Sequence, residues 1–254
     1  MCCFTKNVES VTDTNIFARL GSKGNQVLIY QMNFKSKEEL AMVLPIPVKA
    51  GAGEKAVTFF DFSGYLQVFA NLGELFPVQA KTYGRGADPF GAPAARGALL
   101  EVHSVGAFDA SYVPSIADFS RLDARFRLPE QVWPKLPGYS DFGFAVFKLK
   151  PNHGPVHPMA FAFPTALTGQ VFFPTLHIHD GKIHDREVFD HTLYMQGEGF
   201  DLDTGGWQES PKIAVAKVKC GYAHNMVRPE MHVHRNVIRG NMRNGDIIVQ
   251  PKKI

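Results

Sequence analysis

The chain has 254 residues, of which 45% are hydrophobic and 20% charged, a composition that excludes disordered and collagen-like proteins. No stretch approaches the roughly 18 consecutive apolar residues of a membrane-spanning helix, and residues 1–6 lack the pattern of a secretion signal. We therefore expect a cytoplasmic protein without a membrane partner. Basic residues exceed acidic ones by 27 − 24 = 3 and form no stripe, so nucleic acid is not an expected partner.

The first third of the chain predicts two strands and a helix. The apolar runs 27–34 and 40–48 are typical of strands, and Pro45 and Pro47 are expected to end pairing in the second. Residues 54–62 fit either a strand or the entry to a helix, and 63–76 have helical spacing that stops at Pro77.

Residues 84–97 are rich in Gly, Pro and Ala and have no hydrophobic period, which predicts a mobile loop. This loop is the candidate border between two halves, 1–97 and 98–254, of a single compact domain, 1–254. A weak echo of 27–48 in 144–176 raises the possibility that the halves arose by duplication.

The rest of the chain predicts mostly strands. One amphipathic helix is expected at 114–126, and residues 243–246 are a turn signal. The expected strands are 98–105, 109–113, 143–150, 158–163, 170–179, 212–219, 230–238 and 246–250. We predict an α+β protein dominated by antiparallel sheet, with few helices.

Several of these segments resemble an uncharacterised bacterial family, domain of unknown function 2330. The matching features cover somewhat over half the chain; they are Cys2-Cys3-Phe4, the strand pair 27–32 and 38–48, 105–109, 128–139 and 144–150. The family has no established activity to carry over. The resemblance implies a mature chain that begins with a free cysteine, here Cys2 after removal of Met1.

The three cysteines cannot pair completely, and adjacent Cys2 and Cys3 would form a strained disulfide, so we expect free thiols. An N-terminal cysteine carries a thiol and an α-amine that can serve as its base, as in N-terminal nucleophile amidohydrolases. Cys2 is therefore a candidate catalytic residue. Side chains that could form its oxyanion hole are Asn15, Arg19, Asn225 and Arg228.

The same thiols could instead bind a metal together with histidines. Seven of the ten histidines lie between positions 177 and 234, and two His-x-His pairs would each place both rings on one face of a strand. Thiolates and imidazoles favour copper(I) or zinc. The sequence thus favours a metal-binding protein with copper or zinc as cofactor and a small-molecule substrate, and if an enzyme, an oxidoreductase or hydrolase. The expected ligands are Cys2, Cys3, His177, His179, His191, His232 and His234.

A third interpretation needs no chemistry. A sheet rich in Phe, with the loop 84–97 as a lid, could be a non-catalytic binding module for a partner or an apolar ligand. Cys220 follows an apolar run and is expected in the core. The chain lacks a phosphate-binding loop, a dinucleotide fingerprint and a serine nucleophile elbow, which disfavours kinases, nucleotide-dependent dehydrogenases and serine esterases.

Overall fold

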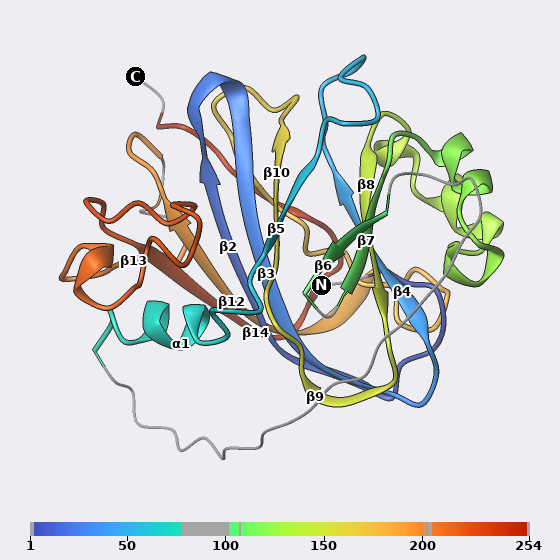
Figure 1. Ribbon diagram of the computed structural model, residues 1–254, viewed down its shortest axis with the longest axis horizontal. Coiled ribbons are helices and arrows are strands. Elements are labelled where there is room, and N and C mark those ends of the chain that lie inside the picture. The colour runs from blue at the N-terminus through green and yellow to red at the C-terminus, as the bar shows by residue number, and fades with distance from the viewer. Residues whose placement is uncertain (1–2, 78–101, 107, 201, 203–204, 253–254) are drawn as a thin grey trace.

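The computed structural model describes the chain except residues 1–2, 78–101, 107, 201, 203–204 and 253–254 (Figure 1). Strands dominate the described part. They are β1 (Cys3–Phe4), β2 (Ser10–Leu20), β3 (Asn25–Ser36), β4 (Leu40–Ile46), β5 (Thr58–Asp61), β6 (His103–Val105), β7 (Phe108–Val113), β8 (Gly143–Leu149), β9 (Asn152–Pro155), β10 (Met159–Pro164), β11 (Val171–Phe173), β12 (Arg186–Gln196), β13 (Gln208–Glu209), β14 (His234–Arg243) and β15 (Ile247–Val249).

The strands form three sheets. A five-stranded sheet has the order β1-β4-β8-β7-β6, and an eight-stranded sheet has the path β13-β14-β12-β2-β3-β10-β5, with β9 paired to β3. A small sheet joins β11 to β15. Both large sheets contain strands from before and from after the segment 84–97. Among the described strands, all pairs are antiparallel except β2 with β12, so the prediction of a mainly antiparallel, sheet-dominated fold is confirmed.

Two hydrophobic cores lie on the two faces of the eight-stranded sheet. Because side chains alternate along a strand, Leu28 and Tyr30 of β3 enter the core shared with the five-stranded sheet, whereas Val27 and Ile29 enter the second core. The second core is covered by the helix α1 (Val68–Gly73) and by residues 214–233. Figure 1 shows α1 and this segment at one end of the molecule, away from β4 and β8.

The apolar strands predicted from sequence are confirmed at β3, β4, β8 and β10. Every residue of β4 is buried, as its unbroken apolar run requires. The expected end at Pro45 is wrong, since β4 continues through Pro45, opposite Phe144, to Ile46. On its other side β4 pairs with β1 only at Met42 and Val43, so the missing amide of Pro45 faces no strand there.

The helices are shorter than predicted. Of the expected helix 63–76 only Val68–Gly73 is α-helical, and the expected helix 114–126 is replaced by two 3-10 helices. The expected strand 212–219 is also wrong, because it contains a 3-10 turn. The 3-10 helices are η1 (Ser22–Gly24), η2 (Ile116–Arg121), η3 (Ala124–Phe126), η4 (Glu130–Lys135), η5 (Pro137–Tyr139) and η6 (Ala214–Ala216). Within the described residues, no helix is long and apolar enough to cross a membrane.

Candidate functional site

The N-terminal strand β1 is inserted between two other segments. Cys3 and Phe4 pair with Val43 and Met42 of β4, and the Phe4 amide donates to the carbonyl of Ile178 at 3.0 Å. Both β1 side chains are fully buried. The start of the described chain is therefore part of the core that the two large sheets share, called the main core below, and lies next to the predicted His177/His179 pair.

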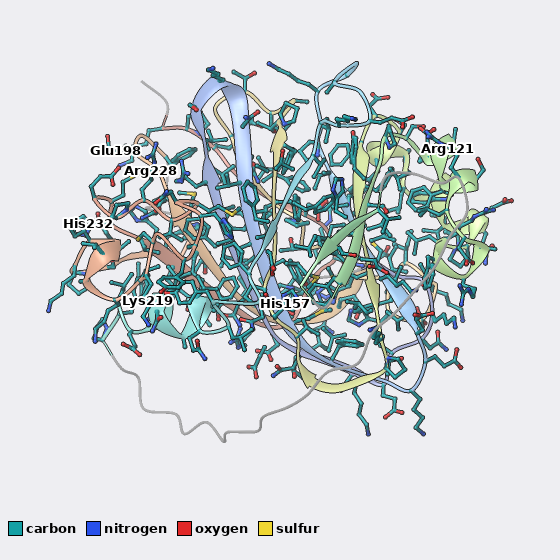
Figure 2. All side chains as sticks on the ribbon, viewed as in Figure 1. Arg121, His157, Glu198, Lys219, Arg228 and His232 are labelled. Carbon is teal, nitrogen blue, oxygen red and sulfur yellow. The ribbon has the colours of Figure 1, made fainter. Side chains whose placement is uncertain are left out.

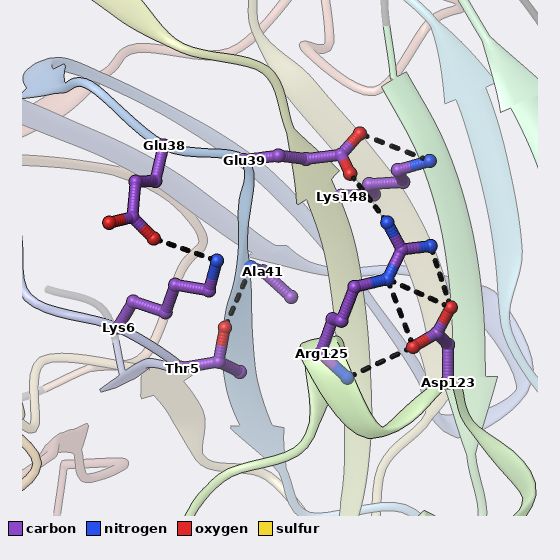
Figure 3. Close-up of polar contacts among 8 residues, drawn as sticks. All are labelled: Thr5, Lys6, Glu38, Glu39, Ala41, Asp123, Arg125 and Lys148. Atoms are coloured by element: carbon purple, nitrogen blue, oxygen red, sulfur yellow. Dashed lines mark hydrogen bonds and ion pairs between the residues drawn. The ribbon is translucent and has the colours of Figure 1, made fainter.

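Polar contacts fasten the chain just after β1 (Figure 3). Thr5 and Ala41 exchange two hydrogen bonds, from the Thr5 amide to the Ala41 carbonyl at 3.0 Å and from the Ala41 amide to the Thr5 hydroxyl at 2.9 Å. Lys6 pairs with Glu38 at 2.9 Å. Beside them, Glu39 forms ion pairs with Lys148 and Arg125, as Figure 3 also shows. Each of these exposed ion pairs adds little stability, so the two hydrogen bonds between Thr5 and Ala41 contribute most to holding this segment against β4.

Three histidines form a cluster beside β1, in which His177 and His191 are buried and His179 is half-buried. The ring of His177 lies 4.9 Å from that of His179 and 5.1 Å from that of His191, and Phe189 packs on His177 at 4.5 Å. His177 and His191 are 3% and 2% exposed. These three predicted ligands lie together, although His177 and His179 lie beyond the end of β11 rather than on a strand, and His191 lies on β12 rather than in a loop.

Burial keeps these imidazoles neutral. It lowers the pKa of His177 to about 2 and that of His179 to about 4, and it also lowers the pKa of His191. In the described part of the chain, Nδ1 of His177 and Nε2 of His179 have no hydrogen-bond partner. The cluster is therefore a neutral group of packed imidazoles, in which Nε2 of His177 and Nε2 of His191 are 3.4 Å apart.

The predicted convergent metal site is absent from the described residues. The second pair lies elsewhere: His232 contacts the Ser210 carbonyl at 2.7 Å, and His234 is four positions along β14 from Ile238, which pairs with His191. Four strand residues span about 13 Å. Within the cluster, Nε2 of His177 and Nε2 of His191 lie 3.4 Å apart, at hydrogen-bond distance, so these two ring nitrogens contact each other. No group of three His, Cys, Asp or Glu suited to a metal occurs among the described residues.

The cysteines do not complete such a site either. Cys2 lies outside the described residues, so its predicted roles as nucleophile and ligand are not tested. Cys3 is fully buried in the main core and Cys220 is 7% exposed in the second core, which confirms the expectation of a core thiol for Cys220. Burial raises the pKa of the Cys220 thiol.

The proposed oxyanion residues are engaged elsewhere. The Asn15 amide donates to the carbonyl of Asp13, and the Arg19 guanidinium donates to the carbonyl of Met226 at 2.9 Å. Asn225 occupies the left-handed region with φ 55°, within the segment that covers the second core. None of these contacts involves a residue of β1.

A buried carboxyl that the sequence did not single out organises this region. Asp246 accepts hydrogen bonds from the Thr175 and Leu176 amides at 2.7 and 2.9 Å and from the Tyr139 hydroxyl at 2.7 Å. Burial raises its pKa to about 6. The turn signal at 243–246 was the available clue, but the turn does not form a hairpin, because β15 pairs with β11 rather than β14.

Asn244 continues this arrangement toward the histidines. Its side chain accepts from the His177 amide at 2.7 Å and donates to the carbonyls of His177 and His184 at 2.9 and 3.0 Å. The side chains of Asn244 and Asp246 thus replace a neighbouring strand for residues 175–177, which explains why the predicted strand 170–179 ends early.

The fold is similar to that of baculovirus P35. The crystal structure of P35 matches with a TM-score of 0.51 and 13% identity over 100% of both chains. A mutated P35 after caspase cleavage matches with a TM-score of 0.51 and 13% identity over 95% of this chain and 100% of P35. The caspase-8/P35 complex has a TM-score of 0.46 and 11% identity over 95% and 97%. No family model and no curated protein matches the chain.

These findings correct two expectations. The metal-binding function built from the two His-x-His pairs is wrong: the pairs lie apart, no group of three His, Cys, Asp or Glu suited to a metal occurs among the described residues, and the fold is similar to that of P35. The expectation of a small-molecule substrate as the partner is also wrong. The protein with the similar fold, P35, was crystallised after cleavage by a caspase, so its partner is a protein. The resemblance to the uncharacterised bacterial family stays a prediction.

Proposed function

We propose that this chain is a non-catalytic protein-binding module whose partner is a protease of the caspase class. The observation that carries the proposal is the likeness to P35 over the whole of both chains. Because that likeness has only 13% identity, it concerns the fold, and the partner is inferred from the caspase cleavage named for P35. The neutral, buried histidine cluster supports a packing role in place of catalysis. The segment 84–97, predicted as a lid, lies outside the described residues.

The proposal is tested by mixing the full chain with active caspases, including caspase-8, and following hydrolysis of a chromogenic peptide. We expect lasting, stoichiometric inhibition and a complex on size-exclusion chromatography. Intact-mass spectrometry should show cleavage of the chain. Trypsin and papain, proteases of other specificity, serve as controls and should not form the complex.

Heat-denatured chain is the matched control for the fold. A denatured chain is expected to compete only transiently, as an ordinary substrate, because a preorganised surface avoids the ordering cost of binding. Absence of inhibition and of a complex with every caspase, at micromolar chain concentration, would refute the proposed partner class.

A further inference from the structure

A cavity of about 500 Å³ lies at the ends of β2 and β12, away from β1 and the histidine cluster. These strands form the parallel pair, and their register places Gln196 directly beside Arg19. Tertiary structure alone creates this juxtaposition, since 177 positions separate the two residues. The lining residues are Arg19, Leu20, Gly169, Gln196, Gly197, Glu198, Gly199, Phe200, Met231 and Pro251.

Arg19 is the buried charge of this cavity. The residue is 9% exposed, its Nε donates to the Met226 carbonyl at 2.9 Å, and its Nη1 donates to the Leu20 carbonyl at 2.9 Å. A guanidinium has five N–H donors, so these contacts leave further donors for a ligand. In the described part of the chain, no carboxylate forms an ion pair with Arg19. A buried charge without an opposite charge is costly, and a bound anion would offset that cost.

The charges around Arg19 favour the binding of an anion. Burial lowers the pKa of Arg19 and the positive charge of Arg228 lowers it further, while Glu230 acts in the opposite direction. Arg228 is held in place by Gln196, whose amide exchanges hydrogen bonds with the Arg228 backbone at 2.8 and 2.9 Å. Gln196 is fully buried. The amide thus fixes the cavity wall, and Arg19 presents the available charge.

The remaining lining selects the shape of the anion. Phe200 and Leu20 offer apolar surface beside the guanidinium, while exposed Glu198 places a negative charge at the rim. Figure 2 shows Glu198 and Arg228 on the same side of the molecule. A single guanidinium fork matches one carboxylate in a bidentate geometry, and Glu198 disfavours a dianion such as phosphate.

We infer that this cavity binds a carboxylate that carries a small apolar group, with Arg19 as its anchor. The ligand is either a free carboxylic acid or the C-terminal carboxylate of a polypeptide, since both present the same group. The volume falls in the range of small-molecule sites. The inference goes beyond the proposed protease binding and does not rest on it.

The test uses the full chain and hexanoate as probe, followed by NMR titration of the backbone amides. We expect saturable shifts at Gly197, Gly199 and Phe200, and about tenfold weaker binding of hexanamide, which has the same length but no charge. A short apolar peptide with a free C-terminus, compared with its amidated form, distinguishes the polypeptide source. Equal binding of hexanoate and hexanamide, or stronger binding of inorganic phosphate, would overturn the inference, as would no binding.

Three variants sharpen the result. Arg19→Gln should weaken hexanoate binding at least tenfold, whereas Arg186→Gln, which removes one charge at the opposite end of β12, should leave it unchanged. If Arg19→Gln fails to fold, the variant Glu198→Gln, at an exposed position, still tests the inference. Removing this negative charge from the rim should tighten hexanoate binding about twofold to fivefold at low ionic strength. Unchanged or weaker binding by Glu198→Gln would contradict a carboxylate ligand.

Discussion

The Tyr139 hydroxyl donates a hydrogen bond to Oδ2 of Asp246 at 2.7 Å, across 107 positions of the chain. Asp246 in turn holds the backbone of Thr175 and Leu176 just before the histidine cluster. One carboxyl group therefore connects the 3-10 helix η5, which ends at Tyr139, with the small β11–β15 sheet and with the segment 175–178 on which β1 packs. This connection makes the stability of the region sensitive to single side chains and to pH.

Tyr139→Phe removes the hydroxyl that donates to the Asp246 carboxylate while keeping the aromatic ring. We expect the free energy of unfolding to fall by about 1–3 kcal/mol, as for other buried groups that lose a hydrogen-bond partner. The loss should be larger at pH 7.5 than at pH 5, because burial raises the pKa of Asp246 to about 6 and the ionised form depends more on donors. Urea denaturation measures both values. Tyr222→Phe, at a 67% exposed tyrosine, is the control and should change stability little.

Acid should destabilise the fold through the histidine cluster. The folded pKa values are about 2 for His177 and about 4 for His179, below the ordinary 6.5, so the unfolded chain binds more protons. Their stabilisation is complete above pH 6.5 and is lost as the pH falls below it, at about 1.4 kcal/mol per pH unit for each histidine. Asp246 opposes this between about pH 4 and 6, because its raised pKa favours the folded state as it becomes protonated.

Urea unfolding from pH 5 to 7.5 tests this balance. His179→Gln should reduce the pH slope by roughly one bound proton. A wild-type stability that stays constant or rises between pH 6.5 and 5 would contradict the neutral, buried state of the cluster.

Phe4→Ala should show how much the inserted strand β1 contributes. Phe4 is fully buried and stacks on Phe34 at a centroid distance of 6.4 Å. Removing a buried phenyl ring costs about 3–5 kcal/mol, and we expect a loss in that range by urea denaturation. Val188→Ala, at a 69% exposed position, should cost less than about 0.5 kcal/mol. A Phe4→Ala loss as small as that of the control would mean that β1 is not part of the core.

The two described cysteines should react slowly with thiol reagents. Cys3 is fully buried and Cys220 is 7% exposed, with a thiol pKa raised by burial. In a Cys2→Ser variant, we expect labelling by a chromogenic disulfide to be far slower in the native state than in urea. Rapid native labelling at either position would show that the cores open readily. Peptide mass spectrometry assigns the labelled residue.

The amino-acid sequence by itself determined the strands whose pattern is unambiguous. The unbroken apolar run of β4 predicts a strand buried on both faces, and the alternating pattern of residues 143–150 predicts the strand β8. The His177/His179 pair also predicted a local cluster. The two longest strands after β3 were not expected: β2 and β12 each mix polar and apolar residues, because one end of each strand lies against the cores and the other does not.

Tertiary structure alone decided what the polar residues do. His191 joins His177 because β12 lies beside the segment that follows β11, whereas His232 and His234 lie in and after the covering segment of the second core. Arg19 meets Gln196 through the parallel pairing of β2 with β12. Such long-range pairings depend on the summed burial of whole sheets, which local periodicity does not encode. The spacing of two His-x-His motifs could therefore suggest a metal site that the register of the strands does not build.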